Sequence, residues 1–231
     1  MNEDKVPIED KVPIGIDLST APRETIELLI DDAQEPSIFE DIMRANMNRP
    51  EILTLLLKNP DAPNEIRQQV AKALHIPVKP HAGIAKVDKP SEVRTQNMLQ
   101  GIQKLSVSEK IYLALRGGKE IRSILLRDSS KEVVSRVLEN PRITETEIEL
   151  LAKSRTVSDE ILRKITKKKG WMKNYNVIMG LVTNPKTPPG IAVTLVSELK
   201  TKDLSMLERN KNVLEGVRAT AKKFLRARRA Y

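Results

Sequence analysis

Residues 127–154, RDSSKEVVSRVLENPRITETEIELLAKS, decide the fold of this chain. Apolar residues recur every three or four positions on both sides of the pair Asn140-Pro141, which is typical of two short amphipathic helices. The pair itself predicts a helix end, because Asn tolerates the left-handed conformation and proline disfavours the right-handed helical region for its predecessor. Thr144, followed three residues later by Glu147, predicts a capping box that starts the second helix.

The same punctuation recurs along the chain. Asn59-Pro60 and Asn184-Pro185 also follow apolar runs, so we expect helices to end there. Further helix starts are predicted by a hydroxyl residue followed by a carboxylate three positions later, or by a hydroxyl residue before proline. These signals are Ser37 with Glu40, Ser106 with Glu109, Ser129 with Glu132, the weaker Thr156 with Asp159, and Thr187-Pro188.

The predicted helix ends are regularly spaced. Asp128, Ser154, Asn184 and Asn210 align as equivalent positions with steps of 26, 30 and 26 residues, and each unit holds at least two short helices. A period of 20–50 residues with two helices per unit is the signature of an α-solenoid. Helices of roughly 8–12 residues are marginal alone, so we expect each to be stabilised by stacking on its neighbours.

Two stretches carry a resemblance to known helical repeats. LLLKNPDAPNEIRQQVAKAL (55–74) and GLVTNPKTPPGIAVTLVSEL (180–199) resemble the bacterial leucine-rich-repeat-variant and HEAT-like class, in which Asn-Pro ends one helix and a Thr-Pro or similar pair starts the next. Residues 105–225 also resemble an uncharacterised deltaproteobacterial family, through RDSSKEVVSRVLENPRITETEIELLAKS and KNYNVIMGLVTNPKTPP. The resemblance implies HEAT-like architecture and a binding surface. The chain lacks the cysteine cluster that precedes some variant repeats, so no metal centre is implied.

Composition shifts predict four segments within this all-α fold. Residues 1–21 begin with EDKVPI twice in tandem and are expected to form a flexible, disordered arm, either a peptide read twice by a partner or a duplication in an unconstrained tail. Residues 22–75 show helical periodicity and form an N-terminal helical module. Residues 76–97 contain three prolines and no periodicity, which indicates a linker, and residues 98–231 form the helical repeat domain.

Composition also excludes several classes of protein. The chain has no Cys, so it holds no disulfide framework, thiolate zinc site, iron–sulfur cluster or cysteine nucleophile. Aromatic residues are 3%, too few for a β-sandwich or barrel. The two histidines, His75 and His81, match no zinc pattern. No apolar run is long enough to span a bilayer and the first residues are acidic, so we expect a cytoplasmic protein with no transmembrane segment.

Charge is divided unevenly. Residues 1–97 hold 12 basic and 17 acidic side chains, a net charge of −5, whereas residues 98–231 hold 28 and 14, a net charge of +14. Such asymmetry favours an acidic partner, nucleic acid or contact between the halves, or it reflects a solvated helical surface. The candidate binding surface is therefore basic with interleaved aromatic residues: Arg163, Lys164, Lys167, Lys168, Lys169, Trp171, Lys173, Tyr175, Arg218, Lys222, Arg226 and Arg229.

Each basic segment has a structural alternative. Lysines before Gly170 can simply compensate the dipole at a helix C-terminus, and Trp171 can be a core anchor instead of a platform for nucleic-acid bases. The basic amphipathic helix around Arg218–Arg229 can cap the solenoid, or lie on anionic lipid or in an acidic partner groove.

No nucleophile–base pair, metal-ligand cluster or phosphate-binding glycine loop is found in the sequence, and Gly117-Gly118 is expected to be a turn. We therefore predict a non-catalytic helical-repeat scaffold or adaptor that binds another protein, with an acidic partner favoured by the charge. The alternative is nucleic-acid binding through a basic face of the C-terminal repeats. An enzyme acting on damaged DNA bases is a third hypothesis, which lacks a buried carboxylate beside aromatic residues. No cofactor is expected.

Overall fold

The computed structural model describes residues 17–33, 35–77 and 91–229, and all regular structure in those ranges is helical, which confirms the predicted all-α class. The first helices are α1 (Arg23–Asp31), α2 (Pro36–Ala45), α3 (Pro50–Lys58), α4 (Asn64–Ala73), α5 (Ser91–Gln103), α6 (Val107–Arg116) and α7 (Lys119–Leu125). They are followed by α8 (Lys131–Val137), α9 (Glu145–Lys153), α10 (Asp159–Lys167), α11 (Tyr175–Thr183), α12 (Pro189–Leu195), α13 (Thr201–Arg209) and α14 (Glu215–Arg229), with 3₁₀ turns η1 (Trp171–Lys173) and η2 (Val196–Glu198).

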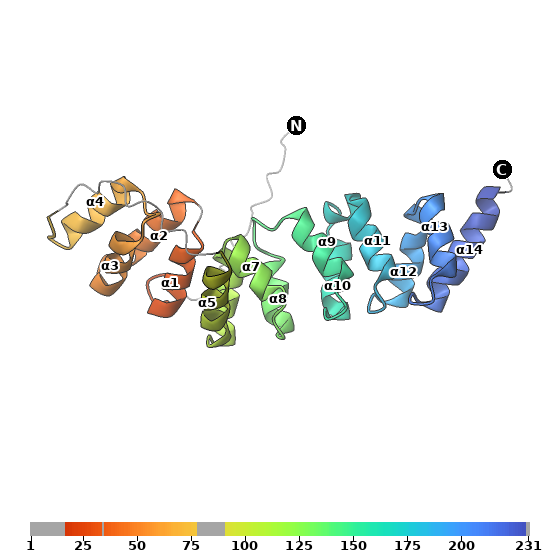
Figure 1. Cartoon of the computed structure of the whole chain (residues 1–231), viewed down its shortest axis with the longest axis horizontal. Coiled ribbons are helices and arrows are strands. Elements are labelled where there is room, and N and C mark those ends of the chain that lie inside the picture. Colours follow the sequence, from red (N-terminus) through yellow and green to blue (C-terminus); the bar gives the residue numbers. More distant parts are fainter. Residues whose placement is uncertain (1–16, 34, 78–90, 230–231) are drawn as a thin grey trace, which may run out of the picture.

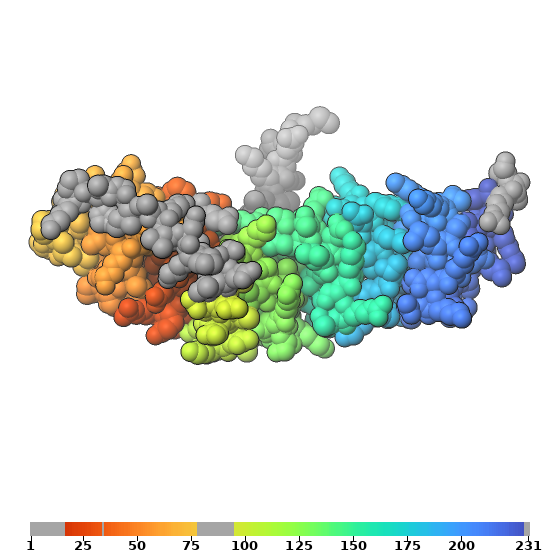
Figure 2. All heavy atoms as spheres, in the orientation of Figure 1, coloured from red at the N-terminus to blue at the C-terminus, as the bar shows by residue number. Residues whose placement is uncertain are grey.

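The helices lie in an elongated row (Figure 1). From α5 to α14 their order along the row follows the sequence, as the colours of Figure 2 show. The first four helices run the other way, so that α1 lies beside α5 and α6 near the middle of the row while α4 lies at its far end. The α1–α4 segment is therefore docked on the later helices through its first helix.

The predicted apolar stripes form the core. Ile26, Ile42, Ile52 and Val70 have no exposed surface, and Leu56 is equally buried. Each stripe belongs to a different short helix, and burial of a large apolar side chain contributes about 1.5–3 kcal/mol. Because one helix of seven to ten residues offers only three or four such side chains, its stability depends on the neighbouring helix that covers them.

Two of the four predicted capping boxes are confirmed. Ser106 and Thr144 each accept the backbone N–H of the third residue of their helix, while Glu109 and Glu147 accept the cap N–H. The two other boxes are wrong. Ser37 lies inside α2 because Pro36 begins that helix, and the cap of α8 is the residue after Ser129.

The two weaker start signals are also shifted. The helix predicted from Thr156 begins at Asp159 after Ser158, and Pro188 rather than Thr187 is the N-cap of α12, with Pro189 as its first residue.

One hydrogen bond recurs at the turns that were aligned from the sequence. The side-chain oxygen at each aligned position accepts the backbone N–H two residues further on, which closes an Asx- or Ser-type turn. The four pairs are Asp128 with Ser130 (2.8 Å), Ser154 with Thr156 (3.4 Å), Asn184 with Lys186 (3.0 Å) and Asn210 with Asn212 (2.9 Å). Each of these turns joins the two helices of one pair, which gives the pairs α7–α8, α9–α10, α11–α12 and α13–α14.

The Asn-Pro pairs end helices through the effect of proline on the preceding residue, and not through a left-handed Asn. Asn59 and Asn184 follow α3 and α11 directly, with φ values of −72° and −79° and extended ψ. Among the residues placed in the structure, His75 is the non-glycine residue with positive φ, so the expected left-handed Asn is wrong. The following proline instead holds each Asn in the extended region, which frees its side chain for tertiary contacts.

Those tertiary contacts join one helix pair to the next. Asn184 Nδ2 donates to the carbonyl oxygens of Ala152 (2.8 Å) and Ser154 (2.9 Å), at the end of α9. Asn140 does the same at the end of α6, reaching Ala114 O at 2.9 Å and Gly117 O at 3.2 Å. Each side chain therefore satisfies carbonyls that a helix C-terminus leaves without an intrahelical partner.

Replacing Asn184 with Ala is expected to lower the free energy of unfolding by about 1–2 kcal/mol, because one buried carbonyl, one part-buried carbonyl and the Lys186 N–H lose their partner. The matched variant is Asn210→Ala, since Asn210 is part-exposed and closes the same turn. Urea denaturation followed by circular dichroism measures both. Equal losses in the two variants would show that the bonds to the preceding helix contribute nothing.

The buried apolar residues fall into two clusters that meet at α8. Val133 and Val137 belong to the cluster that includes α1–α7, whereas Val134 and Leu138 belong to the cluster that continues to α14. Across this junction Arg122 of α7 pairs with Glu147 of α9, with Nε 3.0 Å from Oε1, and the two side chains are 4% and 8% exposed. Thus a buried ion pair fastens the two halves of the core together.

A second polar junction fixes α1 to the middle of the row. The buried Asp32 carboxylate accepts the backbone N–H groups of Ile121 (3.2 Å) and Glu120 (3.4 Å), so it caps α7 from another helix. The N-cap residue of α7 is Gly118, which has no side chain to do so. Burial raises the pKa of Asp32, against the lowering effect of these hydrogen bonds. Thr25 of α1 also donates to Glu109 Oε1 at 3.3 Å.

Glu109 supplies a prediction of pH dependence. Its hydrogen bonds, first that from the Ser106 hydroxyl, hold its pKa below the ordinary value of 4.5, so the folded state releases the Glu109 proton more readily than the unfolded chain. The stabilisation is therefore complete above pH 4.5 and is lost as pH falls through the lowered pKa. Glu109→Gln is expected to cost about 0.3–1 kcal/mol at pH 7 and almost nothing at pH 3 in urea denaturation. A cost that does not change with pH would contradict this assignment.

Two predicted segment limits differ from the structure. The segment predicted as an arm, 1–21, lies outside the described residues only up to position 16; residues 17–20 form a turn, and Leu18 and Ala21 are buried. Arg49 holds that turn by donating to Ala21 O at 2.7 Å. The predicted linker 76–97 is helical from position 91 onward, while residues 78–90 lie outside the described residues.

Candidate functional site

Three of the predicted binding residues make tertiary contacts within the row. Lys168 Nζ donates to Leu138 O at 2.9 Å, and Lys164 Nζ donates to Ser135 Oγ. Both acceptors belong to the preceding helix pair, 29 and 30 residues earlier. Tyr175 accepts the Lys200 N–H at 3.0 Å and donates to Asp203 Oδ2, and burial together with that bond raises its pKa. These side chains therefore stabilise the stacking of helix pairs.

Trp171 has the character of a core anchor. Its partly buried ring packs against the second apolar cluster, and the Lys168 ammonium lies 4.2 Å from the ring centroid. A cation–π contact of this kind contributes about 0.5–1 kcal/mol at an exposed site. Since one side of the ring packs on the core and Lys168 lies over its face, the structure favours the anchor over the base-stacking platform.

The remaining predicted residues lie in two separated places. Lys167, Lys169 and Lys173 are exposed around the end of α10 and η1, where Arg163 pairs with Asp159 at 3.6 Å. On α14, Lys222 and Arg226 are exposed, Arg218 pairs with Glu215, and Arg229 is the last helical residue, with its side chain outside the described part.

Helix α12 separates the two basic places. Helix α12 lies between α10 and α14 in the row, and its sequence PGIAVTL carries no charged residue (Figure 1). A nucleic-acid backbone needs cations at successive positions along its path, and α12 itself supplies none between the two places.

Helix α14 is buried on its apolar side. Val217, Ala221 and Leu225 belong to the second core cluster, and Arg228 donates to Leu199 O at 2.9 Å. An amphipathic helix binds a lipid surface by inserting its apolar face, and here that face already packs against the row. The structure therefore favours the interpretation of α14 as a capping helix.

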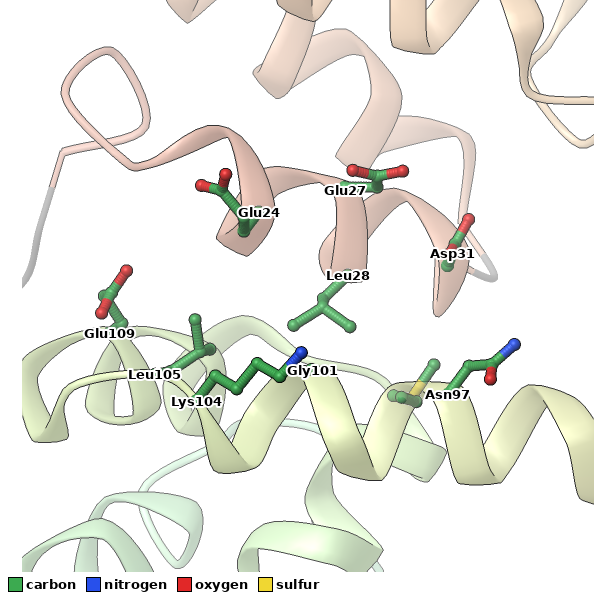
Figure 3. Close-up of a pocket in the computed structure, with 10 residues that line it drawn as sticks. Glu24, Glu27, Leu28, Asp31, Asn97, Gly101, Lys104, Leu105 and Glu109 are labelled. Atoms are coloured by element: carbon green, nitrogen blue, oxygen red, sulfur yellow. The ribbon is translucent and has the colours of Figure 1, made fainter.

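A cleft lies elsewhere in the row, between α1 and α5. Its volume is about 480 Å³, and Leu28, Met98 and Leu105 form its apolar floor beside Gly101. In Figure 3, Leu28 points from α1 toward Gly101 on α5, while Glu24, Glu27 and Asp31 follow one another along the α1 wall. Glu109 lies at the end near Leu105, and Asn97 and Lys104 complete the lining.

Gly101 sets the width of this cleft. A methyl group at that position would lie 3.2 Å from Leu28 Cδ2, closer than apolar side chains normally approach. The small residue therefore lets α1 pack closely on α5 while the apolar floor stays accessible from outside.

Comparisons with protein-family models, curated proteins and solved structures give no match for this chain.

The charge of the cleft is acidic, opposite to that of the predicted surface. Glu24, Glu27 and Asp31 are exposed, and the lowered pKa of Glu109 keeps that carboxyl ionised. Lys104 is the one cation among the lining residues that the structure describes. Carboxylates around an apolar floor attract a positively charged group that has an apolar stem or lies next to an apolar side chain.

The spacing of residues on the two helices is a sequence signal for this cleft. Glu24, Glu27 and Asp31 recur at spacings of three and four beside Leu28, and Met98, Gly101 and Leu105 recur likewise on α5. What the periodicity could not show is that α1 and α5, some 70 residues apart, are neighbours.

Metal and membrane sites are not seen in the described ranges. No group of three or more His, Asp or Glu side chains in residues 17–33, 35–77 and 91–229 could hold a metal ion. His75 follows α4 with φ of 56°, and His81 lies outside the description. Within the same ranges, every helix is too short or too polar to cross a membrane.

Proposed function

We propose that this protein is a non-catalytic α-solenoid scaffold or adaptor of HEAT-like helix pairs that binds another protein. Support for the solenoid comes from hydrogen bonds that join each pair to the next at separations of 29 to 32 residues, such as Asn174 to Glu145 and Arg228 to Leu199. Short helices joined in this way form an elongated body with a large surface for its size, which suits binding rather than enclosure of a substrate.

The observation that carries the binding proposal is the cleft between α1 and α5. Its apolar floor and acidic wall match a partner segment in which a Leu-like side chain is flanked by Lys or Arg. The apolar side chain would fill the floor at Leu28 and Leu105, and the basic residues would meet Glu24 and Glu27. A basic partner replaces the acidic partner that the overall charge favoured.

The test is a pull-down from the native host with three versions of the full chain. The wild type is compared with Glu24→Gln/Glu27→Gln, which neutralises the cleft wall, and with Glu65→Gln/Glu132→Gln, which neutralises two exposed carboxylates on α4 and α8. We expect one or more proteins to be retained by the wild type and by the α4/α8 variant and to decrease about tenfold with the cleft variant.

Circular dichroism verifies that all three versions fold equally. Recovery of no protein by any version would overturn the scaffold proposal. Equal recovery of the same proteins by all three would show that binding occurs away from the cleft.

A further inference from the structure

A second cavity lies on the edge of the row where the turns of successive helix pairs meet. It has a volume of about 250 Å³ and lies between the turn before α8, the turn before α10 and the turn before α12. Its polar lining comes from Arg127, Lys131 and Lys186, with hydroxyls from Ser129, Thr156 and Ser158, over an apolar base that includes Val134 and Ile161. One cavity thus receives cations from two separate turns, those before α8 and α12, and hydroxyl residues from the turn before α10.

The three cations have no ion-pair partner among the residues that the structure describes, and two neighbouring aspartates pair with other lysine and arginine side chains. Asp128, the one carboxylate in the lining, is 2.9 Å from Lys110 Nζ and accepts the Ser130 N–H at 2.8 Å. Asp159 pairs with Arg163 on the outside of α10. Arg127, Lys131 and Lys186 therefore give the cavity a positive charge that is not compensated within the fold.

Ser158 also lines this cavity. Its Oγ atom is buried without a hydrogen-bond partner, although Ser158 is the N-cap of α10 and would ordinarily accept an amide of the first turn. A buried hydroxyl without a partner costs free energy, and rotation of the Ser158 side chain toward the cavity would give it an acceptor on a bound anion. The nine-residue helix α10 also directs the positive end of its dipole toward this place.

We propose that this cavity binds a phosphate group. The three cations would surround its oxygens, and Ser158 Oγ would donate to one of them. Phosphate fits better than a carboxylate, because a tetrahedral dianion has oxygens enough to meet donors arriving from three directions. The turns hold the donors in place, since the Lys186 backbone is fixed by Asn184 and the α8 turn by Asp128.

Two kinds of ligand carry such a phosphate group: the free inorganic anion, and a phosphate monoester on a side chain or metabolite. Titration of the full chain with inorganic phosphate and, separately, with O-phosphoserine distinguishes them, with chloride at equal ionic strength as the reference. Nuclear magnetic resonance detects the backbone amides of residues 127–131, 156–161 and 186. We expect saturable shifts confined to those amides, weaker below pH of about 6, where the phosphate dianion gains a proton.

Tighter binding of O-phosphoserine than of inorganic phosphate would assign the site to a monoester, and equal affinity would assign it to the free anion. Both results support the proposal. Small shifts that are spread over all exposed lysines and never saturate would overturn it, because they indicate general ionic attraction.

Matched variants separate a binding role from a structural one. Lys131→Gln/Lys186→Gln is expected to weaken phosphate binding at least tenfold, because it removes charge-assisted hydrogen bonds to the anion. Lys222→Gln/Lys223→Gln, which removes two exposed charges on α14, should leave the affinity unchanged. Ser158→Ala should weaken binding severalfold without lowering the thermal midpoint, since it removes an unpartnered hydroxyl. Equal affinity in the Lys131/Lys186 and Lys222/Lys223 variants would overturn the proposal, as would unchanged affinity in Ser158→Ala.

Discussion

Glu147→Ala is expected to lower the free energy of unfolding by about 3–5 kcal/mol, a large share of the stability of a typical domain. The carboxylate accepts from Arg122 Nε at 3.0 Å and from the Thr144 N–H at 2.7 Å, so one substitution removes an ion pair and a helix cap together. Arg122 is 3% exposed and its charge would remain in the core without a counter-ion. A buried charge without a counter-ion destabilises the folded state more than two apolar side chains at the same positions would.

The position of this pair gives the substitution a second effect. It joins α7 to α9 at the junction of the two apolar clusters, and Trp171 belongs to the surroundings of only one of them. Tryptophan fluorescence therefore reports the C-terminal cluster, whereas circular dichroism reports all helices. In the wild type we expect the two urea transitions to coincide, and in Glu147→Ala we expect them to separate.

The control for this prediction is Glu139→Ala. Glu139 pairs with Arg136 at 2.9 Å on the surface, and loss of such a pair costs about 0.2–1 kcal/mol. Arg122→Met/Glu147→Leu should recover much of the stability lost by Glu147→Ala, because apolar side chains remove the unpaired charge. If Glu147→Ala costs no more than Glu139→Ala, the junction is not held by the buried pair.

Gly118→Ala is expected to be the second most damaging change, at about 3 kcal/mol. Its added methyl group would lie 2.7 Å from the Asp32 carbonyl oxygen and 2.8 Å from Asp32 Oδ2, where no atom can be accommodated without movement. The φ of Gly118 is −75°, so the backbone itself accepts alanine and the clash alone opposes it. Relief requires α1 to move away from α7, which breaks the cap that Asp32 provides.

Gly190→Ala is the matched control, since no atom lies within 4 Å of the added methyl group. Alanine favours a helix over glycine by about 0.5–1 kcal/mol, so this variant should be as stable as the wild type or more so. Hydrogen exchange measured by mass spectrometry locates the effect: Gly118→Ala should increase exchange in α1–α4 and α7 more than in α11–α14. Uniform exchange along the chain would contradict the docking of α1 on α7.

Local signals in the sequence predicted local structure well. Ser106 and Thr144 were correct as caps because a capping box depends only on four consecutive residues. Ser37 fits the same pattern yet lies within α2, since that helix begins at Pro36, two residues earlier than it would with Ser37 as its N-cap. The chain has many Ser–x–x–Glu-like stretches, and a neighbouring proline decides which of them is used.

Contacts between distant residues could not be predicted in this way. The sequence shows Lys164 and Lys168 as part of a basic run, but their acceptors on Ser135 and Leu138 are one helix pair away. The same limit applies to the two cavities described above, since the α1–α5 cleft joins helices far apart in the chain and the cavity near α8 and α10 joins three turns. Periodicity places a residue on a helix face, whereas stacking decides what that face meets.

The central claim is that short helices form an elongated row by packing on their neighbours. The absence of Cys allows Gln68→Cys on α4 and Lys222→Cys on α14 to carry the only two spin labels, at exposed positions near opposite ends. A compact sphere of this length has a radius of gyration of roughly 17 Å and a diameter of roughly 45 Å. For the elongated row, we expect the distance between the two spin labels, measured by double electron–electron resonance spectroscopy, to exceed that diameter. A distribution centred well below it would contradict the row and the scaffold proposal with it.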